Sequence, residues 1–263
     1  MSRINLSIIV VSLNTKNKFI KTIQSINSQT YNNYEIIIVD GKSTDGTIEE
    51  ILKIKNFFLK YLIEKDKGIY QAMNKGIHLA SGNWVIFLNS GDVFCNRNVL
   101  KNIFKISALE KKDIIFGNTF VKNYNLKYFI KSKKFSNRTN IMPFCHQSTL
   151  VKTPIIKKNK FSLKYKYSSD FNFFYKCFLN NKFFYDSNLT IATVEANGLS
   201  DKNRNKVYNE NIQILKKYNY NLFLIVNLWL LKLVNSVKCC FKFILPSPVI
   251  NWILKFKYYK FNL

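Results

Sequence analysis

The sequence has few acidic residues, two histidines and no apolar run of membrane-spanning length. It holds 15 Asp and Glu against 41 Lys and Arg, a formal charge of +26. A spanning helix needs about 20 predominantly apolar residues, and lysines interrupt the apolar C-terminal stretch too soon for that. The five cysteines form no Cys-x-x-Cys pair, which argues against a zinc site. We expect reduced thiols in a cytosolic compartment.

The first apolar stretch, residues 6–13, lacks the features of a secretory leader. It is short, has no small-residue cleavage site and runs into a polar segment. No glycine follows it between Leu13 and Lys18, although a nicotinamide-dependent dehydrogenase should carry Gly-x-Gly-x-x-Gly at this point. The stretch therefore predicts a β-strand and argues against a dehydrogenase.

The chain is long and apolar enough to bury a sizeable core. With 263 residues and 47% hydrophobic content, we expect one domain of about 200 residues with an appended tail. Residues 1–120 hold 16 basic and 10 acidic residues, whereas residues 121–263 hold 25 and 5. Such an excess suggests nucleic acid or an anionic membrane as partner, although a genome rich in AT codons also enriches Lys. The partner-facing charge is expected in the second half.

Strand and helix patterns alternate through the first hundred residues. Apolar, β-branched runs predict strands, and apolar residues at helical spacing predict the helices between them; Thr47 and Glu50 form a capping-box pattern. This alternation implies a three-layer α/β fold with a mostly parallel sheet. We expect strands at 6–13, 34–39, 61–63, 84–88 and 113–116, a hairpin at 123–125, and helices at 19–26, 48–55, 68–80, 169–179 and 205–218.

Single carboxylates follow three of the predicted strands, at Asp40, Asp66 and Asp92. Open α/β sheets bind ligands beyond the carboxyl ends of their strands, where a divalent cation or a phosphate is a common occupant. Asp92 follows the apolar run 85–88 and is the most informative of the three. A simple turn residue is the alternative for each.

Four motifs in this order resemble the opening of family 2 glycosyltransferases. They occupy residues 29–31, 36–47, 66–76 and 82–92. The resemblance is close over residues 6–105, looser over 140–200, and strongest to bacterial enzymes of capsule, O-antigen or exopolysaccharide synthesis. It implies the GT-A nucleotide-sugar-binding fold in a domain of residues 1–220, with a nucleotide-binding half, 1–110, and an acceptor and base half, 111–220.

The resemblance also implies roles for individual residues. Asp40 would hydrogen-bond the nucleotide base, Asp66 would line the nucleotide pocket, and Gly68 would open a helix whose N–H groups face an anionic ligand. A turn for Asp40, a helix cap for Asp66 and a core position for His146 are the alternatives. Further substrate-binding roles are implied for Ser12, Asn14, Asn74, Asn89 and His146.

The metal motif departs from the family pattern. Where the family typically carries Asp-x-Asp, this chain has Asn89, Ser90, Gly91 and Asp92. The resemblance implies that Asp92 binds Mg²⁺ or Mn²⁺, with the donor diphosphate and water as the remaining ligands. The missing carboxylates also allow a catalytically weakened homologue.

Asp170 lies in the second half, where the resemblance implies the catalytic base that deprotonates the acceptor hydroxyl. It stands at the start of the helix predicted over 169–179. An Asp at a helix start is also favourable capping chemistry, so a purely structural role is the alternative.

The tail, residues 221–263, is predicted to associate with a membrane. Residues 211–263 hold eight Lys and no acidic residue. On a helical wheel, one side carries Trp229 and Phe241, and the other carries Asn227, Lys232, Asn235, Ser236, Lys238 and Lys242. This pattern is typical of a basic amphipathic helix lying in the bilayer interface. Packing on the domain or on a partner chain is the alternative.

These features predict an inverting, metal-dependent glycosyltransferase of the hexosyltransferase type. It would move a sugar from a UDP-, GDP- or dTDP-sugar to an acceptor hydroxyl, on a glycan or polyprenyl-linked acceptor, in capsule or lipopolysaccharide biosynthesis. We expect a cytoplasmic protein, peripheral on the inner face of the cell membrane. Nucleic acid is not an expected partner because no recognition motif is present, but a basic membrane-binding or nucleic-acid-binding protein stays an alternative.

Overall fold

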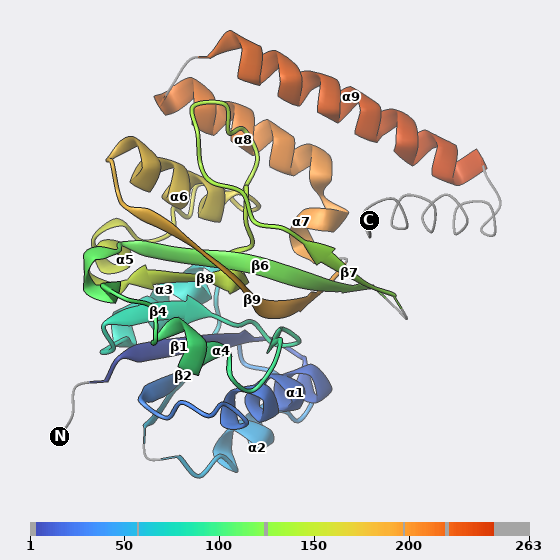
Figure 1. Ribbon diagram of the computed structural model, residues 1–263. Coiled ribbons are helices and arrows are strands. Elements are labelled where there is room, and N and C mark those ends of the chain that lie inside the picture. The colour runs from blue at the N-terminus through green and yellow to red at the C-terminus, as the bar shows by residue number, and fades with distance from the viewer. Residues whose placement is uncertain (1–3, 57, 124–125, 197, 219–220, 245–263) are drawn as a thin grey trace.

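The structure of the protein, a computed structural model, describes residues 4–56, 58–123, 126–196, 198–218 and 221–244, the last seven of them as backbone. Strands and helices alternate through the first half (Figure 1). In chain order they are β1 (Leu6–Ser12), α1 (Lys16–Asn27), β2 (Tyr34–Asp40), α2 (Thr47–Leu52), β3 (Leu59–Ile63), α3 (Ile69–Leu79), β4 (Trp84–Phe87), β5 (Val93–Phe94) and α4 (Val99–Ile103).

The second half mixes a hairpin, two further strands and five helices. Its longest helices, α8 and α9, lie side by side at the top of Figure 1. The elements are β6 (Ile114–Asn123), β7 (Leu126–Ile130), β8 (Thr149–Lys152), α5 (Thr153–Asn159), α6 (Ser169–Leu179), β9 (Phe184–Glu195), α7 (Leu199–Lys202), α8 (Arg204–Tyr218) and α9 (Leu222–Ile244), with short 3₁₀ turns at Leu109–Lys111 and His146–Ser148.

The nine strands of the described residues join one sheet in the order β3-β2-β1-β4-β8-β6-β9-β5, and β7 extends β6 as a hairpin. The first four strands are parallel. β8 runs antiparallel to both β4 and β6, whereas β9 is parallel to β6. The expected α/β fold with a mostly parallel sheet is confirmed.

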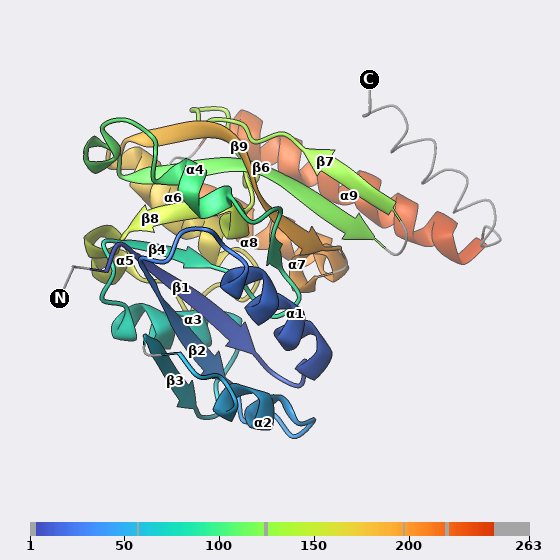
Figure 2. The same ribbon diagram turned by 60° about the horizontal axis from the view of Figure 1, so that its bottom comes forward.

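Helices cover both faces of the sheet (Figures 1 and 2). Within β1, Ile8 and Val10 pack in the core on the side of α1, α2 and α4, whereas Ile9 and Val11 pack in the core shared with α3, α5, α6 and α8. Successive side chains of a strand point to opposite faces. Because both faces are covered, both sets must be apolar, which explains the nearly continuous apolar run of β1.

The capping box expected at Thr47 and Glu50 is wrong. Helix α2 spans Thr47–Leu52 instead of 48–55, and Gly46 precedes it without a side-chain cap. The Asp45 carboxylate accepts hydrogen bonds from the N–H groups of Thr47, at 3.1 Å, and Lys16, at 2.9 Å. Glu50 pairs with Lys53 at 2.9 Å instead of reaching back to the helix start.

The first part of the predicted tail forms α9, which packs along α8 (Figure 1). Leu224, Ile225 and Leu228 are buried in the same core as α6 and α8. Among the described residues, no helix has the length and apolar composition needed to cross a bilayer. The second tail segment, expected after Pro246, lies outside the described residues, as does the side chain of Phe241.

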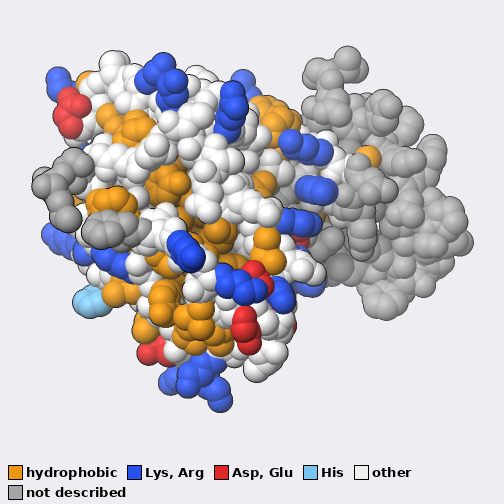
Figure 3. Space-filling view, turned by 90° about the horizontal axis from the view of Figure 1, so that it is seen from below, with side chains coloured by type: hydrophobic (Ala, Val, Ile, Leu, Met, Phe, Trp, Pro, Cys, Tyr) orange, Lys and Arg blue, Asp and Glu red, His pale blue; other side chains and the backbone are white. Residues whose placement is uncertain are grey.

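Lys and Arg side chains are spread over the face seen from below, where they are more prominent than Asp and Glu (Figure 3). The charge imbalance of the sequence is therefore carried by the surface.

Candidate functional site at the carboxyl ends of the strands

The Asp40 side chain joins the ends of β1 and β2. It is buried, and its carboxylate accepts hydrogen bonds from the Ser12 hydroxyl and from the Ser43 amide and hydroxyl, each at 2.7 Å. The Asn14 side-chain oxygen makes a further contact between the two loops by accepting the Thr44 N–H at 2.8 Å. The loops after β1 and β2 are thus held together by polar contacts.

Asp66 lies against the same edge of the sheet. A Cβ atom at Gly41 would stand 2.9 Å from Asp66 Oδ2, so only glycine allows this approach. Asp66 Oδ1 accepts the Gly68 N–H at 2.8 Å. Gly68 precedes α3 with φ of +131°, a region that favours glycine, and nothing lies within 4 Å of its Cβ position. The α3 N-terminus therefore opens onto free space beside Asp66.

The loop that carries Asp92 is anchored to α1. The Thr22 hydroxyl donates to the Asp92 carbonyl at 2.8 Å and accepts the Gly91 N–H at 2.9 Å. Gly91 has φ of +103° and lies against Lys18 and Glu195, which form an ion pair. A side chain at this position would be strained by the backbone and crowded by that pair.

The Asp92 carboxylate is buried, and the contacts that favour its charge do not offset this burial. It is 7% exposed, its Oδ2 accepts a hydrogen bond from Gln147 Nε2 at 2.9 Å, and the Glu195 backbone also donates to the carboxylate. Burial raises the pKa of Asp92 to about 6, against the opposing effect of the Gln147 bond. At neutral pH the carboxylate is mostly ionised and would gain from a cation.

Asp170, at the start of α6, makes a cluster with residues from two other segments. Its Oδ1 accepts the Tyr70 hydroxyl and the Phe171 N–H, both at 2.9 Å, and its Oδ2 stands 3.3 Å from His146 Nδ1. Burial alone would raise the pKa of Asp170, but the contacts with His146, Phe171 and Tyr70 outweigh it, and the pKa lies below its usual value. Asp170 is therefore an ionised acceptor at neutral pH.

A carboxylate on α8 holds the turn that leads into α6. The Glu210 carboxylate accepts the N–H groups of Lys166, Tyr167 and Ser168 at 2.8–2.9 Å, and Ser168 is the N-cap of the helix. Within the first turn of α6, Asp170 Oδ1 accepts the Phe171 N–H. Asp170 therefore combines a local contact at the helix start with its contacts to Tyr70 and His146.

Asp92 and Asp170 line one cavity of about 530 Å³. His146 and Gln147 are consecutive residues, so the contacts of His146 with Asp170 and of Gln147 with Asp92 connect the two carboxylates. Four buried polar atoms of cavity-lining residues have no partner within the described chain: Asn89 Oδ1, Ser90 Oγ, His146 Nε2 and Asn211 Oδ1. Because an unmet buried polar atom is costly, these atoms mark where a polar ligand would bind.

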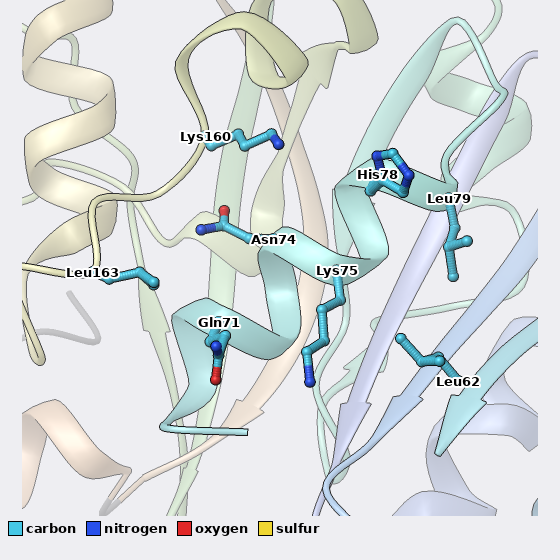
Figure 4. Close-up of a pocket in the computed structure, with 8 residues that line it drawn as sticks. All are labelled: Leu62, Gln71, Asn74, Lys75, His78, Leu79, Lys160 and Leu163. Carbon is cyan, nitrogen blue, oxygen red and sulfur yellow. The ribbon is translucent and has the colours of Figure 1, made fainter. Parts of the chain in front are cut away.

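The structure does not bring every predicted site residue to this cavity. Ser12, Asn14, Asp40 and Asp66 lie at the same sheet edge but outside the cavity lining. Asn74 lines a separate hollow of about 320 Å³ beside α3 (Figure 4). There its side-chain amide exchanges two hydrogen bonds, of 2.8 and 2.9 Å, with the Phe161 backbone.

Sequence reasoning assigned no role to two residues of the cavity, Tyr70 and Gln147. Both lie inside recognised segments, Tyr70 two residues after Gly68 and Gln147 directly after His146. Their partners are 100 and 55 residues away along the chain. The sequence offered one signal for these residues, their closeness to Gly68 and His146. That closeness does not predict which side chains they contact.

The oxygen atoms near Asp92 could bind a divalent cation that also contacts a bound ligand. Within the described residues, no three His, Cys, Asp or Glu side chains gather as a metal cluster. The Asp92 carboxylate and the unpartnered Asn89 oxygen line the same cavity, and both are oxygen donors of the kind that Mg²⁺ and Mn²⁺ prefer. Such a site is completed only by oxygen atoms from outside the chain.

The α/β fold, with carboxylates at the ends of its parallel strands and a polar cavity beside them, matches the GT-A fold of glycosyltransferases. The family profile described as Glycosyl transferase family 2 matches residues 7–187. The chain belongs to this family and is a glycosyltransferase.

Curated relatives agree with this assignment. A PGL/p-HBAD biosynthesis glycosyltransferase of Mycobacterium bovis is 29% identical over 185 residues, which cover 66% of this chain and 70% of the relative. An uncharacterized glycosyltransferase of Rickettsia bellii is 30% identical over 156 residues, which cover 57% of this chain and 22% of the relative.

Solved structures share the fold at low sequence identity. S. aureus TarS 1–349 superposes with a TM-score of 0.64 at 20% identity, covering 85% of this chain and 71% of that chain. The mannosyltransferase PcManGT of Pyrobaculum calidifontis, solved with GDP-Man and Mn²⁺, gives a TM-score of 0.64 at 17% identity, covering 84% and 66%. TarS 1–349 has also been solved with UDP and with UDP-GlcNAc.

Proposed function

We propose that this protein is an inverting, metal-dependent glycosyltransferase that moves one sugar from a nucleoside-diphosphate sugar to an acceptor hydroxyl. The observation that carries the proposal is the connection of Asp92 and Asp170 through Gln147 and His146 in one cavity. Asp92 suits a cation that would bind the donor diphosphate, and Asp170 suits the proton of the acceptor hydroxyl.

The donor would bind along the carboxyl edge of the first four strands. Asp40 and Asp66 would hold the nucleoside, with Ser12 and Asn14 supporting that loop, and the diphosphate would reach the Asp92 end. Asp92, with Asn89 beside it, would hold Mg²⁺ or Mn²⁺. When bound, such an ion stabilises the negative charge of the departing diphosphate. The Mn²⁺ and GDP-Man of the PcManGT structure support this choice.

Asp170 would be the catalytic base. The acceptor oxygen forms a bond to the anomeric carbon while the bond from that carbon to the diphosphate breaks on the opposite face. The hydroxyl proton passes to the Asp170 carboxylate, which is ionised at neutral pH because its pKa is lowered. His146 Nδ1 and the Tyr70 hydroxyl hold this carboxylate in place.

We further propose a polyprenyl-diphosphate-linked glycan as acceptor, at the cytoplasmic face of the cell membrane, in surface polysaccharide synthesis. The apolar residues Ile141, Met142 and Pro143 line the cavity beside His146 and would suit the lipid-proximal part of such an acceptor. The basic, acid-free C-terminal region supports a location at an anionic membrane surface.

Thermal unfolding with UDP-, GDP- and dTDP-sugars, with and without Mn²⁺, tests the donor assignment. A ligand that binds only the native state raises the apparent stability by about 2.7 kcal/mol at 100 times its Kd. We expect one nucleotide class to raise the melting temperature, and to do so more strongly with Mn²⁺. If no nucleotide sugar shifts the transition with or without the ion, the proposed donor site is wrong.

A further inference from the structure

Helix α9 turns polar side chains toward the protein. The Asn140 side chain donates to the Asn227 side-chain oxygen at 2.9 Å. On α8, Asn205 hydrogen-bonds Asn235 at 2.8 Å and Ser236 at 2.9 Å. With buried Leu224, Ile225 and Leu228, these contacts fix the rotation of α9 about its axis.

The outward face of α9 is apolar over residues 222–237, the part whose side chains the structure describes. Its eight apolar side chains are 46–72% exposed and recur at intervals of one, three or four residues, which places them on one side of a helix. We call this surface the outer stripe, and it consists of Leu222, Phe223, Val226, Trp229, Leu230, Leu233, Val234 and Val237. A water-exposed helix would show the reverse arrangement, with apolar residues inward and polar residues outward.

We propose that the outer stripe lies in the interface of an anionic bilayer. This inference deepens the proposed membrane-linked acceptor by naming the surface that contacts the lipid. Its physical basis is independent of the chemistry at Asp92 and Asp170, because burial of an apolar helix face and attraction of lysines to anionic headgroups suffice for binding.

Charge selects the bilayer over a second copy of the chain. Residues 211–263 carry eight lysines and no acidic residue, and the whole chain carries +26. Pairing two such tails would bring like charges together, whereas an anionic surface attracts them. Lys232 Nζ lies 4.6 Å from the centroid of the Trp229 ring. A lysine beside an aromatic ring at the edge of an apolar stripe suits the headgroup boundary.

The inward face of helix α9 is also linked to the cavity by a short stretch of chain. Asn140, which donates to Asn227 of α9, also accepts the Asn211 side-chain N–H of α8 through its carbonyl at 2.9 Å. Six residues further along the same segment is His146, and Ile141 and Met142 between them line the cavity. A bilayer beneath α9 would therefore lie close to the apolar side of the cavity.

Vesicle co-sedimentation of the full chain tests this inference. We compare vesicles of phosphatidylcholine alone with vesicles that also contain phosphatidylglycerol. The stripe variant carries Phe223→Ser, Trp229→Ser and Leu230→Ser, at side chains 72%, 52% and 56% exposed. The control variant carries Leu52→Ser, Leu163→Ser and Phe183→Ser, at side chains 60%, 61% and 52% exposed. Both remove similar exposed apolar surface.

We expect the wild type and the control to bind phosphatidylglycerol vesicles, and the stripe variant to bind about tenfold more weakly or worse, since three large apolar side chains no longer insert. Added salt should weaken wild-type binding without abolishing it, because screening removes the lysine contribution and leaves apolar insertion. Far-ultraviolet dichroism should be the same for all three proteins. If the stripe variant unfolds, Val226→Ser with Leu233→Ser replaces it in the same comparison.

Two results would overturn the inference. Equal vesicle binding by the stripe variant and the wild type would assign binding to other residues. Sedimentation velocity that shows a wild-type dimer, a monomeric stripe variant and no vesicle binding would assign the outer stripe to a second copy. The vesicle assay contains no donor or acceptor, so its result does not depend on glycosyl transfer. Failure of the vesicle assay and failure of a glycosyl transfer assay are therefore distinguishable.

Discussion

Two carboxylates at the carboxyl edge of the parallel strands have different surroundings. Asp40, at the end of β2, is fully buried, and its oxygens accept three hydrogen bonds, from Ser12 and Ser43. Asp92, in the loop after β4, is nearly as buried, but the effect of burial on its charge outweighs the hydrogen bonds from the Gln147 side chain and the Glu195 backbone. Unpartnered polar atoms of Asn89 and Ser90 line the cavity beside it.

The difference separates a carboxylate that builds the site from one that is prepared for a ligand. The hydrogen bonds of Asp40 hold two loops in place, which stabilises the protein with no ligand present. The unmet charge of Asp92 makes the unliganded protein less stable and favours the binding of a cation. Asp170 combines the two situations, because it is well hydrogen-bonded and also lines the cavity.

The largest expected effect concerns Asp170 and turnover. Asp170→Asn keeps an oxygen for Tyr70 and Phe171 but removes the proton acceptor, so turnover should fall by about 10²–10⁴-fold. Donor affinity and melting temperature should change little. Initial rates measure turnover, and thermal unfolding measures stability. A loss of stability that matches the loss of activity would favour a structural role for Asp170 instead.

Asp40→Ala should destabilise the fold more than any change at Asp92. It leaves the Ser43 amide and the Ser12 and Ser43 hydroxyls without their partner, and unmet buried donors cost roughly 2–4 kcal/mol together. Urea unfolding measures the free energy, with Glu49→Ala as control because Glu49 is exposed on α2. A variant as stable as the control would show that Asp40 does not hold the loops.

Asp92→Asn should stabilise the ion-free protein while it removes the response to Mn²⁺. The raised pKa, about 6, means that folding takes up a proton on Asp92 between about pH 4 and 6. The corresponding stability is present at low pH and is lost as the pH rises through 6. At pH 7.5 the neutral side chain should therefore add about 1–3 kcal/mol.

Melting temperatures at pH 5 and pH 7.5, with and without Mn²⁺, check this prediction. The difference between wild type and Asp92→Asn should be smaller at pH 5 than at pH 7.5, because the wild type regains its proton-linked stability as the pH falls from about 6 toward about 4. Mn²⁺ with donor should raise the melting temperature of the wild type alone at pH 7.5. A variant that is less stable than wild type at both pH values would contradict the view that Asp92 is kept for a ligand.

The smallest expected effect is that of Ser12→Ala. It removes one of the three hydrogen bonds to Asp40 and should lower the free energy of unfolding by about 1 kcal/mol. Donor affinity should fall only to the extent that the loop after β2 becomes less ordered. Comparing Ser12→Ala, Asp40→Ala and their combination in a double-mutant cycle measures the coupling of the two side chains. Fully additive losses would show that the 2.7 Å contact contributes nothing to the free energy of unfolding.

The sequence by itself determined the alternation of the first half and the start of α6. Apolar runs such as 36–39 are suited to burial on both faces, so they predict parallel strands covered by helices, and the structure has β2 there. The helix expected over 169–179 is α6. The motifs also identified the family, because their residue types and spacings are local features that a sequence displays directly.

Only the tertiary structure decided which side chains meet. Tyr70 reaches Asp170 across 100 residues of chain, and Gln147 reaches Asp92 across 55. The helical wheel grouped the polar residues of α9 correctly, but packing on α8 turned Asn227, Asn235 and Ser236 toward the protein and left the apolar residues exposed. Periodicity determines that a helix has two faces, whereas the shape and polarity of its neighbours determine which face is buried.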